Sequence, residues 1–268
     1  MIKEAIEKAG KKIDLTESET RKVFEEIMSG HASPEDITVL LRALREKGET
    51  VGEITGAAKV MIEKSLPVDA GIDLIDTCGT GGSGANTFNI STTVAFVVAG
   101  CGVKVAKHGN RSASNQCGSA DVLEALGVKL EASADKVRKY ILDIGIGFMY
   151  APAFHSAMKY AIAPRRTLGG RTIFNILGPI SNPARVKAQV IGVYDEKLTE
   201  LVAHVLKNLG SKKAFVVCGE GNLDEITITG KTKITELKNS VIKTYYVTPE
   251  EFGLKRASLE DKYYASGP

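Results

Sequence analysis

An alternation of strand and helix patterns after Pro67 is the feature that most constrains how this chain folds. A short apolar strand pattern at 71–76 leads through a glycine-rich loop into a small, apolar helix pattern at 91–100, and a second strand pattern follows at 103–106. A strand–loop–helix–strand unit of this kind is typical of a parallel sheet.

The same alternation continues toward the C-terminus. We expect helices at 119–128 and 196–210, strands at 188–194 and 213–219, and strands or hairpin pieces at 225–230, 232–237 and 241–247. The sequence therefore predicts an α/β domain with a mostly parallel central sheet.

The first part of the chain, to about residue 66, has a helical pattern throughout. Capping residues mark its helix starts: Thr16 with Glu19, Ser33 before Pro34, and Thr50 with Glu53. Helices this short need partners to bury their apolar faces, and we expect a second subunit to supply part of that burial. The predicted organisation is a small helical domain at 1–70 and a larger α/β domain at 71–268.

Composition excludes several classes of protein. The net charge of +3 over 268 residues is too weak to predict nucleic-acid binding. No apolar run reaches about 18 residues, so we expect no membrane span. The 4 cysteines have no C-x-x-C spacing, and we interpret them as reduced thiols of a cytoplasmic protein.

The glycine-rich loop "GTGGSG", at 79–84, predicts phosphate binding because backbone N–H groups there can approach an anion closely. Its G-x-G-x-x-G spacing fits a dinucleotide site, but the expected acidic residue about 20 positions on is missing, and so is the Gly-Lys-Ser/Thr of a nucleotide triphosphate loop. The residues behind it, Thr87, Asn89, Ser91 and Thr92, offer neutral donors and a hydroxyl that a hard metal can use. A flexible turn is the alternative.

A basic cluster, Lys107 to Asn115, begins at the end of the next predicted strand. The carboxyl ends of neighbouring parallel strands meet in one crevice, so we expect this cluster to line the same site as the glycine loop. A solvated basic turn is the alternative.

Two further groups carry chemistry. Asp224 and Glu225 follow the predicted strand at 213–219, where Mg²⁺ could be held by carboxylates, substrate phosphates and the Ser91 hydroxyl, although such pairs often only face water. Arg165 can bind a carboxylate through its two-pronged guanidinium. His155 lies nearby in sequence, although a single histidine is more often structural.

Four segments together resemble one known family. They are "GTGGSGANTFNIST", "KHGNRSASNQCGSADVLEALG", "MKYAIAPRRTLGGRTIFNILGPISNPA" and "GEGNLDEIT", and in this order and spacing they are similar to the motifs of the anthranilate phosphoribosyltransferase family. The resemblance implies a homodimer that associates through the helical domain, with the segment near 165–180 packed on that domain and the active site at the hinge. It implies transfer of the phosphoribosyl group of 5-phosphoribosyl 1-pyrophosphate to anthranilate.

The resemblance also implies site residues, position by position. Phosphoribosyl pyrophosphate would be held by Gly79, Gly82, Ser83, Thr87, Asn89, Ile90, Ser91, Thr92, Lys107, His108, Gly109, Asn110, Arg111, Ser112, Ala113, Ser114, Asn115 and Ser119. Anthranilate would contact Gly79, Asn110 and Arg165, with His155 and Pro179 nearby. Magnesium would be bound by Ser91, Asp224 and Glu225. We hypothesise that no single side chain is the catalyst, and that Arg165, His108 and Asn110 lie nearest the acceptor.

The chain departs from the family pattern at three places. Ser83 stands where an aspartate is usual, and Asn115, Gln116 and Cys117 replace Ser, Lys and Ser. The family also continues beyond the position that matches Pro268. If its C-terminal helices are absent, we expect exposed apolar surface and reduced stability.

Two other functions stay open. One is a pyrimidine nucleoside phosphorylase-like transferase. The other is a non-enzymatic relative that binds nucleic acid or a partner protein, for which we would expect a basic groove and eroded metal residues. The presence of Ser91, Asp224 and Glu225 argues against that second alternative.

Overall fold

The computed structural model describes residues 1–81, 88–111 and 117–258. The chain divides into two compact units. A helical unit consists of Met1–Pro67 and Pro152–Arg185, and an α/β unit consists of Val68–Ala151 and Val186–Pro268. No helix in the described ranges is both long and apolar enough to cross a membrane.

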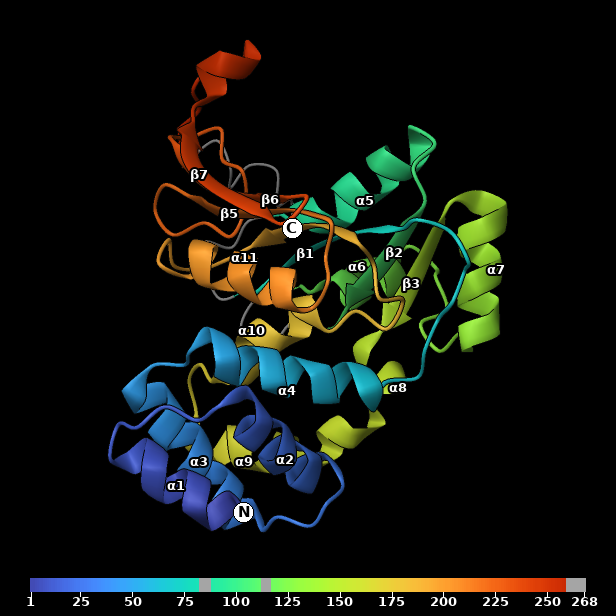
Figure 1. Cartoon of the computed structure of the whole chain (residues 1–268). Coiled ribbons are helices and arrows are strands. Elements are labelled where there is room, and N and C mark those ends of the chain that lie inside the picture. The colour runs from blue at the N-terminus through green and yellow to red at the C-terminus, as the bar shows by residue number, and fades with distance from the viewer. Residues whose placement is uncertain (82–87, 112–116, 259–268) are drawn as a thin grey trace. The chain divides into compact units, whose positions relative to one another are not determined.

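The helical unit is built from two stretches of the chain (Figure 1). The first stretch holds α1 (Ile2–Gly10), α2 (Glu17–Met28), α3 (Pro34–Lys47) and α4 (Val51–Glu63). The second begins within the short α8 (Ala151–Phe154) and holds the 3₁₀ turn η1 (Ser156–Met158), α9 (Lys159–Leu168) and α10 (Ile173–Ile180). Helix α9 packs against α3 and α2, and α10 packs against α4 and α3.

The predicted helix caps are confirmed. Thr16 and Glu19 bond reciprocally, since the Thr16 Oγ1 accepts from the Glu19 N–H at 3.2 Å and the Glu19 carboxylate accepts from the Thr16 N–H at 2.9 Å. The Ser33 hydroxyl caps α3, with Pro34 at its first position. Each cap satisfies backbone donors that a helix start leaves without a partner in the helix.

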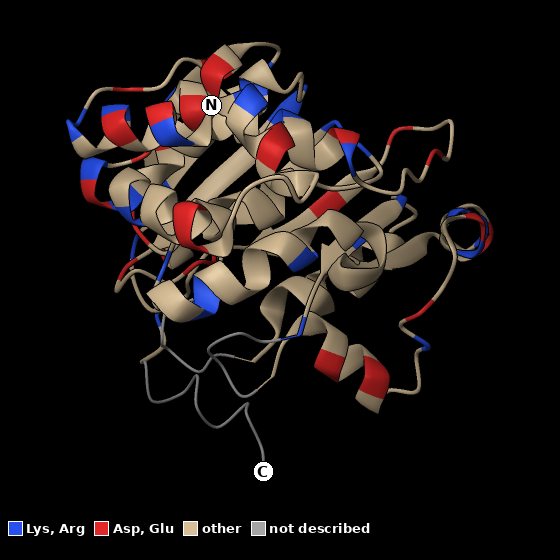
Figure 2. Ribbon diagram, turned by 90° about the horizontal axis from the view of Figure 1, so that it is seen from below, with Lys and Arg blue, Asp and Glu red and all other residues tan. Residues whose placement is uncertain are grey.

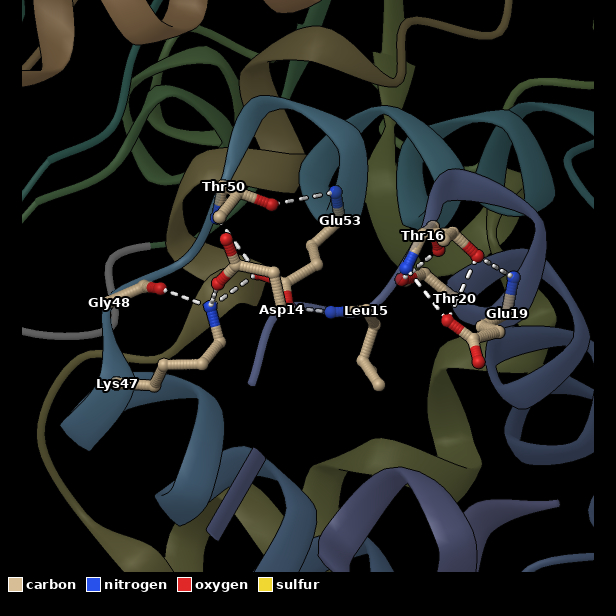
Figure 3. Close-up of polar contacts among 9 residues, drawn as sticks. All are labelled: Asp14, Leu15, Thr16, Glu19, Thr20, Lys47, Gly48, Thr50 and Glu53. Carbon is tan, nitrogen blue, oxygen red and sulfur yellow. Dashed lines mark hydrogen bonds and ion pairs between the residues drawn. The ribbon is translucent and has the colours of Figure 1, made fainter. Parts of the chain in front are cut away.

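A buried ion pair joins the ends of two helices (Figure 3). The Glu53 side chain is fully buried; its carboxylate accepts from the Leu15 N–H at 2.9 Å, the Thr50 N–H at 2.8 Å and the Lys47 Nζ at 3.0 Å. Lys47 also pairs with Asp14 at 2.7 Å. Burial alone would lower the pKa of Lys47, but hydrogen bonds to Asp14 and Glu53 outweigh burial and raise it.

The α/β unit contains one seven-stranded sheet in the order β3-β2-β1-β4-β5-β6-β7. Its strands are β1 (Ile75–Gly79), β2 (Val105–Gly109), β3 (Ile146–Tyr150), β4 (Ala188–Gly192), β5 (Lys213–Gly219), β6 (Thr232–Lys238) and β7 (Val241–Val247). Strands β1 to β5 run parallel, and β6 and β7 are antiparallel additions. The mostly parallel sheet is therefore confirmed.

The prediction of a strand at 225–230 is wrong. These residues form an irregular loop. The Thr227 Oγ1 lies 2.7 Å from the Thr229 Oγ1 and accepts from the Thr229 N–H, and the Thr227 N–H donates to Thr232 Oγ1. Local threonine bonds of this kind compete with a sheet ladder for the backbone, although the alternating Thr and Ile residues suit a strand.

Helices flank the sheet: α5 (Ile90–Gly100), α6 (Ser119–Ala125), α7 (Ala134–Ile144) and α11 (Leu198–Asn208), followed by the 3₁₀ turn η2 (Pro249–Phe252). Helix α5 contacts β1 and β2, α7 contacts β3, and α11 contacts β5 and β6 (Figure 1). Helix α5 is apolar yet open to solvent, with Phe96 and Val97 exposed by 45% and 61% and only Thr92 and Ala95 buried.

Candidate active site

The parallel strands β1, β2, β4 and β5 all end in glycine at their carboxyl edge, namely in Gly79, Gly109, Gly192 and Gly219. Gly79 and Gly192 are register partners. They lie where the strand order reverses, because the chain moves from β1 to β2 and β3 on one side and from β4 to β5 on the other. Ligands of open α/β sheets bind at such a border, outside the carboxyl ends. The candidate site is therefore this edge of the sheet.

The loop after β5 that carries Asp224 and Glu225, called the acidic loop below, contacts the glycine-rich loop after β1. The Asp224 Oδ2 accepts a hydrogen bond from the backbone N–H of Gly81 at 2.8 Å. A β-carbon at Gly79 would lie 2.5 Å from the same oxygen, so only glycine leaves room for this carboxylate. The structure thus brings together two motifs that lie 143 residues apart in the sequence.

Lys107 is a buried cation at the centre of the site. It is 1% exposed, and its Nζ donates to the Thr77 carbonyl oxygen at 2.6 Å and to the Ser91 Oγ at 3.3 Å. The Thr77 hydroxyl in turn donates to the Ser91 carbonyl oxygen at 2.8 Å. Among the described residues, no carboxylate forms an ion pair with Lys107. A buried charge normally requires a charged partner, so this ammonium group is prepared for an anion.

The remaining described residues of the segment "GTGGSGANTFNIST" lie at the start of α5. Asn89 precedes the helix, and its Oδ1 accepts from the Thr92 Oγ1 at 2.6 Å. The Asn89 Nδ2 donates to the Cys117 carbonyl oxygen at 3.3 Å, which links this motif to the loop before α6. Ile90 is the first residue of the helix.

The second motif follows β2 along the same edge. His108 is buried, and its N–H donates to the Asp76 Oδ1 at 3.3 Å. The Ser119 Oγ donates to the Asn110 carbonyl oxygen at 3.2 Å. A β-carbon at Gly109 would overlap the Ser119 Oγ, so the start of α6 closes directly onto the end of β2.

Arg111 forms ion pairs that the sequence analysis did not predict. Its guanidinium pairs with Asp121 at 2.9 Å and with Glu124 at 2.7 Å, and it lies 5.9 Å from the centre of the Tyr150 ring. Hydrogen bonds to Glu124 and Asp121 raise the pKa of Arg111. In this conformation the arginine therefore braces α6, and the predicted phosphate contact would require it to exchange partners.

Several predicted binding residues lie outside the described ranges. They are Gly82, Ser83, Thr87, Ser112, Ala113, Ser114 and Asn115.

The thiol of Cys78 lies beside the site in a neutral form. Burial, followed by the negative charge of Asp76, raises the pKa of Cys78 to about 12. A thiolate nucleophile at this position is therefore disfavoured at neutral pH.

Arg165 belongs to the helical unit, on α9. It is half-buried, and its guanidinium lies 5.4 Å from the centre of the Phe174 ring, within cation–π range. Burial lowers the pKa of Arg165. No carboxylate of the described residues forms an ion pair with it. A half-buried guanidinium over an aromatic ring suits an aromatic carboxylate ligand.

His155 and Pro179 also belong to the helical unit, whereas Gly79 and Asn110 belong to the α/β unit. His155 is buried, and burial lowers its pKa to about 4 despite hydrogen bonds with backbone groups of Ser181 and Met61. The imidazole is therefore neutral at neutral pH. Pro179 is buried within α10.

The predicted metal residues offer oxygen donors only. Asp224 and Glu225 are half-buried side chains of the acidic loop, and Ser91 offers a hydroxyl at the start of α5. Groups of three His, Cys, Asp or Glu side chains that could hold a metal do not occur in the described ranges. Magnesium usually needs only one or two carboxylates together with substrate phosphates, so this donor set fits it.

Sequence reasoning missed Gly192 and Asp76. Gly192 ends the apolar run "AQVIG", and a glycine at a strand end is the signal that could have identified it. Asp76 ends the apolar segment "GIDLID", where a carboxylate has no apolar role.

Family models match both parts of the chain. Residues 3–65 match the helical bundle domain of a glycosyl transferase family, and residues 71–264 match its α/β domain.

Two curated relatives share the name anthranilate phosphoribosyltransferase. The enzyme of Geotalea uraniireducens (strain Rf4) is 55% identical over an aligned stretch of 276 positions, and the alignment covers 97% of this chain and 79% of the relative. The enzyme of that name from Moorella thermoacetica is 53% identical over 262 residues, covering 97% of this chain and 77% of the relative.

Solved structures agree. Anthranilate phosphoribosyltransferase from Thermus thermophilus superposes with a TM-score of 0.90 at 43% identity, covering 96% of this chain and 77% of that one. The Saccharomyces cerevisiae enzyme in complex with PRPP and Mg superposes with a TM-score of 0.83 at 30% identity, covering 92% and 72%. This chain therefore belongs to the anthranilate phosphoribosyltransferase family.

Proposed function

We propose that this chain transfers the phosphoribosyl group of 5-phosphoribosyl 1-pyrophosphate to the amino group of anthranilate, in tryptophan synthesis. The products are N-(5-phosphoribosyl)anthranilate and pyrophosphate. The observation that carries the proposal is Lys107, a buried cation whose described partners are neutral oxygens, at the carboxyl edge of the sheet. A polyanionic substrate would supply the missing countercharge.

The phosphorylated substrate is proposed to lie over β1 and β2. Lys107 and the backbone N–H groups of the glycine loop would bind its phosphates. Asp224, Glu225 and Ser91 would hold Mg²⁺, which when bound supplies positive charge to the pyrophosphate leaving group. Stabilising the negative charge that develops on pyrophosphate makes it a better leaving group.

The acceptor is proposed to be held through its carboxylate by Arg165, with the Phe174 ring below the guanidinium. The amine of anthranilate is uncharged at neutral pH, so its lone pair can attack the sugar carbon without a general base while the bond from that carbon to pyrophosphate breaks. The proton that the nitrogen then loses would pass to pyrophosphate or water. His155 is buried and neutral at that pH, so we propose that it forms a wall of the pocket and does not carry a proton. The rate enhancement would then come from positioning and electrostatics.

We further propose a cytoplasmic homodimer that associates through the helical unit. Exposed apolar side chains on that unit support the assembly, among them Val39 at 44% and Ile162 at 45%. Free thiols at the described cysteines support a reducing compartment. Sedimentation velocity at several protein concentrations tests the dimer, and a monomer throughout would contradict it.

Loss of anthranilate fluorescence tests the enzymatic proposal. Wild-type protein with phosphoribosyl pyrophosphate and Mg²⁺ is expected to produce a decay whose rate is proportional to protein concentration, and Asp224→Asn with Glu225→Gln is expected to slow it at limiting Mg²⁺. No decay, together with retention on DNA at physiological salt, would favour a binding protein instead. Figure 2 shows basic and acidic residues interspersed along the described part of the ribbon.

A further inference from the structure

Strands β4 and β5 end in glycines that lie directly beneath the acidic loop. A β-carbon at Gly192 would overlap the carbonyl oxygen of Asp224 and lie 3.0 Å from its Cα. A β-carbon at Gly219 would lie 2.9 Å from the carbonyl oxygen of Glu225 and 2.9 Å from the Thr227 Cγ2. Both positions therefore exclude every side chain unless the loop moves.

Backbone conformation does not explain these two glycines. Neither Gly192 nor Gly219 adopts a positive φ, whereas twelve other glycines in the described ranges do. Glycine inside or at the end of a strand weakens the strand, and it often marks a close approach of another backbone. The requirement at both positions is space for the acidic loop.

Hydrogen bonds fix the loop at this short distance from the sheet. The Gly219 N–H donates to the Leu223 carbonyl oxygen at 2.7 Å, and the Leu223 N–H donates back to the Gly219 carbonyl oxygen at 3.1 Å. At the other end, the Asp224 carboxylate accepts from Gly81, and the Gly192 carbonyl oxygen accepts from the Thr80 N–H at 2.9 Å. The height of Asp224 over the sheet is thus set by the absence of a side chain below it.

We propose that Gly192 and Gly219 are positioning residues for the Asp224–Glu225 pair, and that they determine where this pair can hold magnesium on the substrate phosphates. The inference rests on the proposed magnesium-dependent transfer. An alanine would lift the loop by roughly 1 Å, and a displacement of that size near reacting groups can cost about 100-fold in rate. The larger displacement is expected at Gly192, where the overlap is with the Asp224 backbone itself.

Manganese binding tests the inference without turnover. Free Mn²⁺ is measured by electron paramagnetic resonance with phosphoribosyl pyrophosphate present and anthranilate absent. Gly192→Ala is expected to raise the apparent Kd for Mn²⁺ at least tenfold, and Gly219→Ala is expected to raise it by a smaller factor. Gly100→Ala is the matched control, because a β-carbon there meets nothing within 4 Å and its φ is not positive; its Kd should equal that of the wild type.

A double-mutant cycle separates positioning from general damage. In an Asp224→Asn background, Gly192→Ala is expected to add no further loss of Mn²⁺ affinity, because its effect passes through that carboxylate. Full additivity would overturn the inference, and so would wild-type affinity in both glycine variants. If circular dichroism shows that Gly192→Ala does not fold, Gly219→Ala with Glu225→Gln decides in the same way.

The Mn²⁺ measurement distinguishes failure of the proposed function from failure of the inference about the two glycines. Wild-type protein that binds no Mn²⁺ in the presence of phosphoribosyl pyrophosphate would remove the proposed function, and the inference with it. Wild-type protein that binds Mn²⁺ while the glycine variants bind equally well would remove the inference alone.

Discussion

Arg165 and Arg166 are neighbours on α9 with different surroundings. Arg165 is half-buried over Phe174, whereas Arg166 is exposed. A hydrogen bond to a charged group contributes about 1.5–3 kcal/mol, so Arg165→Ala is expected to raise the KM for anthranilate about 10- to 100-fold and to leave the KM for phosphoribosyl pyrophosphate nearly unchanged. Steady-state kinetics provide the measurement, and Arg166→Ala is the matched control. An unchanged KM for anthranilate in Arg165→Ala would contradict the assignment.

His155 links burial to acid stability. Burial lowers its pKa from 6.5 to about 4, so between these values the unfolded chain binds more protons than the folded one. Stability contributed by the neutral imidazole is therefore present above pH 6.5 and is lost as the pH falls toward 4, by up to about 3 kcal/mol. Urea midpoints measured from pH 7 to pH 4 should fall less steeply for His155→Asn than for the wild type. Parallel pH profiles would show that His155 does not titrate in this range.

At the level of secondary-structure elements, Glu53 joins the loop at Leu15, the end of α3 and the start of α4 (Figure 3). Glu53→Gln removes the charge that faces the buried Lys47 and puts an amide donor among backbone donors. Breaking a buried pair in this way costs about 3–5 kcal/mol, and the Asp14 contact of Lys47 would offset part of that cost. Urea unfolding should show the loss. Glu7→Gln, which breaks an exposed pair with Lys11, should leave the midpoint unchanged.

Two substitutions on α5 test which face of this helix packs on the sheet. Val97 is 61% exposed and Ala95 is fully buried. Val97→Lys is expected to leave stability and transferase activity unchanged and to reduce binding of an apolar dye, because it removes exposed apolar surface. Ala95→Lys should unfold the α/β unit or lower its thermal midpoint strongly. Equal effects of the two substitutions would contradict the observed orientation of α5.

Local chemistry explains how much of the fold the sequence predicted. Helix caps such as Thr16 with Glu19 act within one turn, so they were predicted. Apolar strands of a parallel sheet are continuous runs, so β4 and β5 were predicted within two residues, whereas β1 and β2 begin a few residues after the expected starts and β3 was not predicted. The loop at 225–230 was not, because its threonines bond locally although their spacing suits a strand.

The candidate site was predictable as motifs but not as contacts. The glycine loop, Lys107 and Asp224 were identified from residue type and spacing. The contact of Arg111 with Tyr150 and the role of Gly192 depend on which strand ends meet in the sheet, and spacing along the chain does not encode that pairing.

At the scale of the whole molecule, the proposed transfer requires both units. The proposed anthranilate residues Arg165, His155 and Pro179 belong to the helical unit, and Gly79 and Asn110 belong to the α/β unit. The proposed phosphate and magnesium residues belong to the α/β unit alone. Phosphate binding and transfer to the acceptor are therefore expected to be separable experimentally.

Phosphorus NMR of the complete reaction observes the proposed transfer itself. With wild-type protein, anthranilate and Mg²⁺, the signals of phosphoribosyl pyrophosphate are expected to be replaced by pyrophosphate and one new phosphate monoester in equal amounts. Omitting anthranilate, or chelating Mg²⁺ with EDTA, should leave the substrate signals unchanged. Persistence of the substrate in the complete mixture, or release of pyrophosphate without anthranilate, would contradict the transfer that we propose.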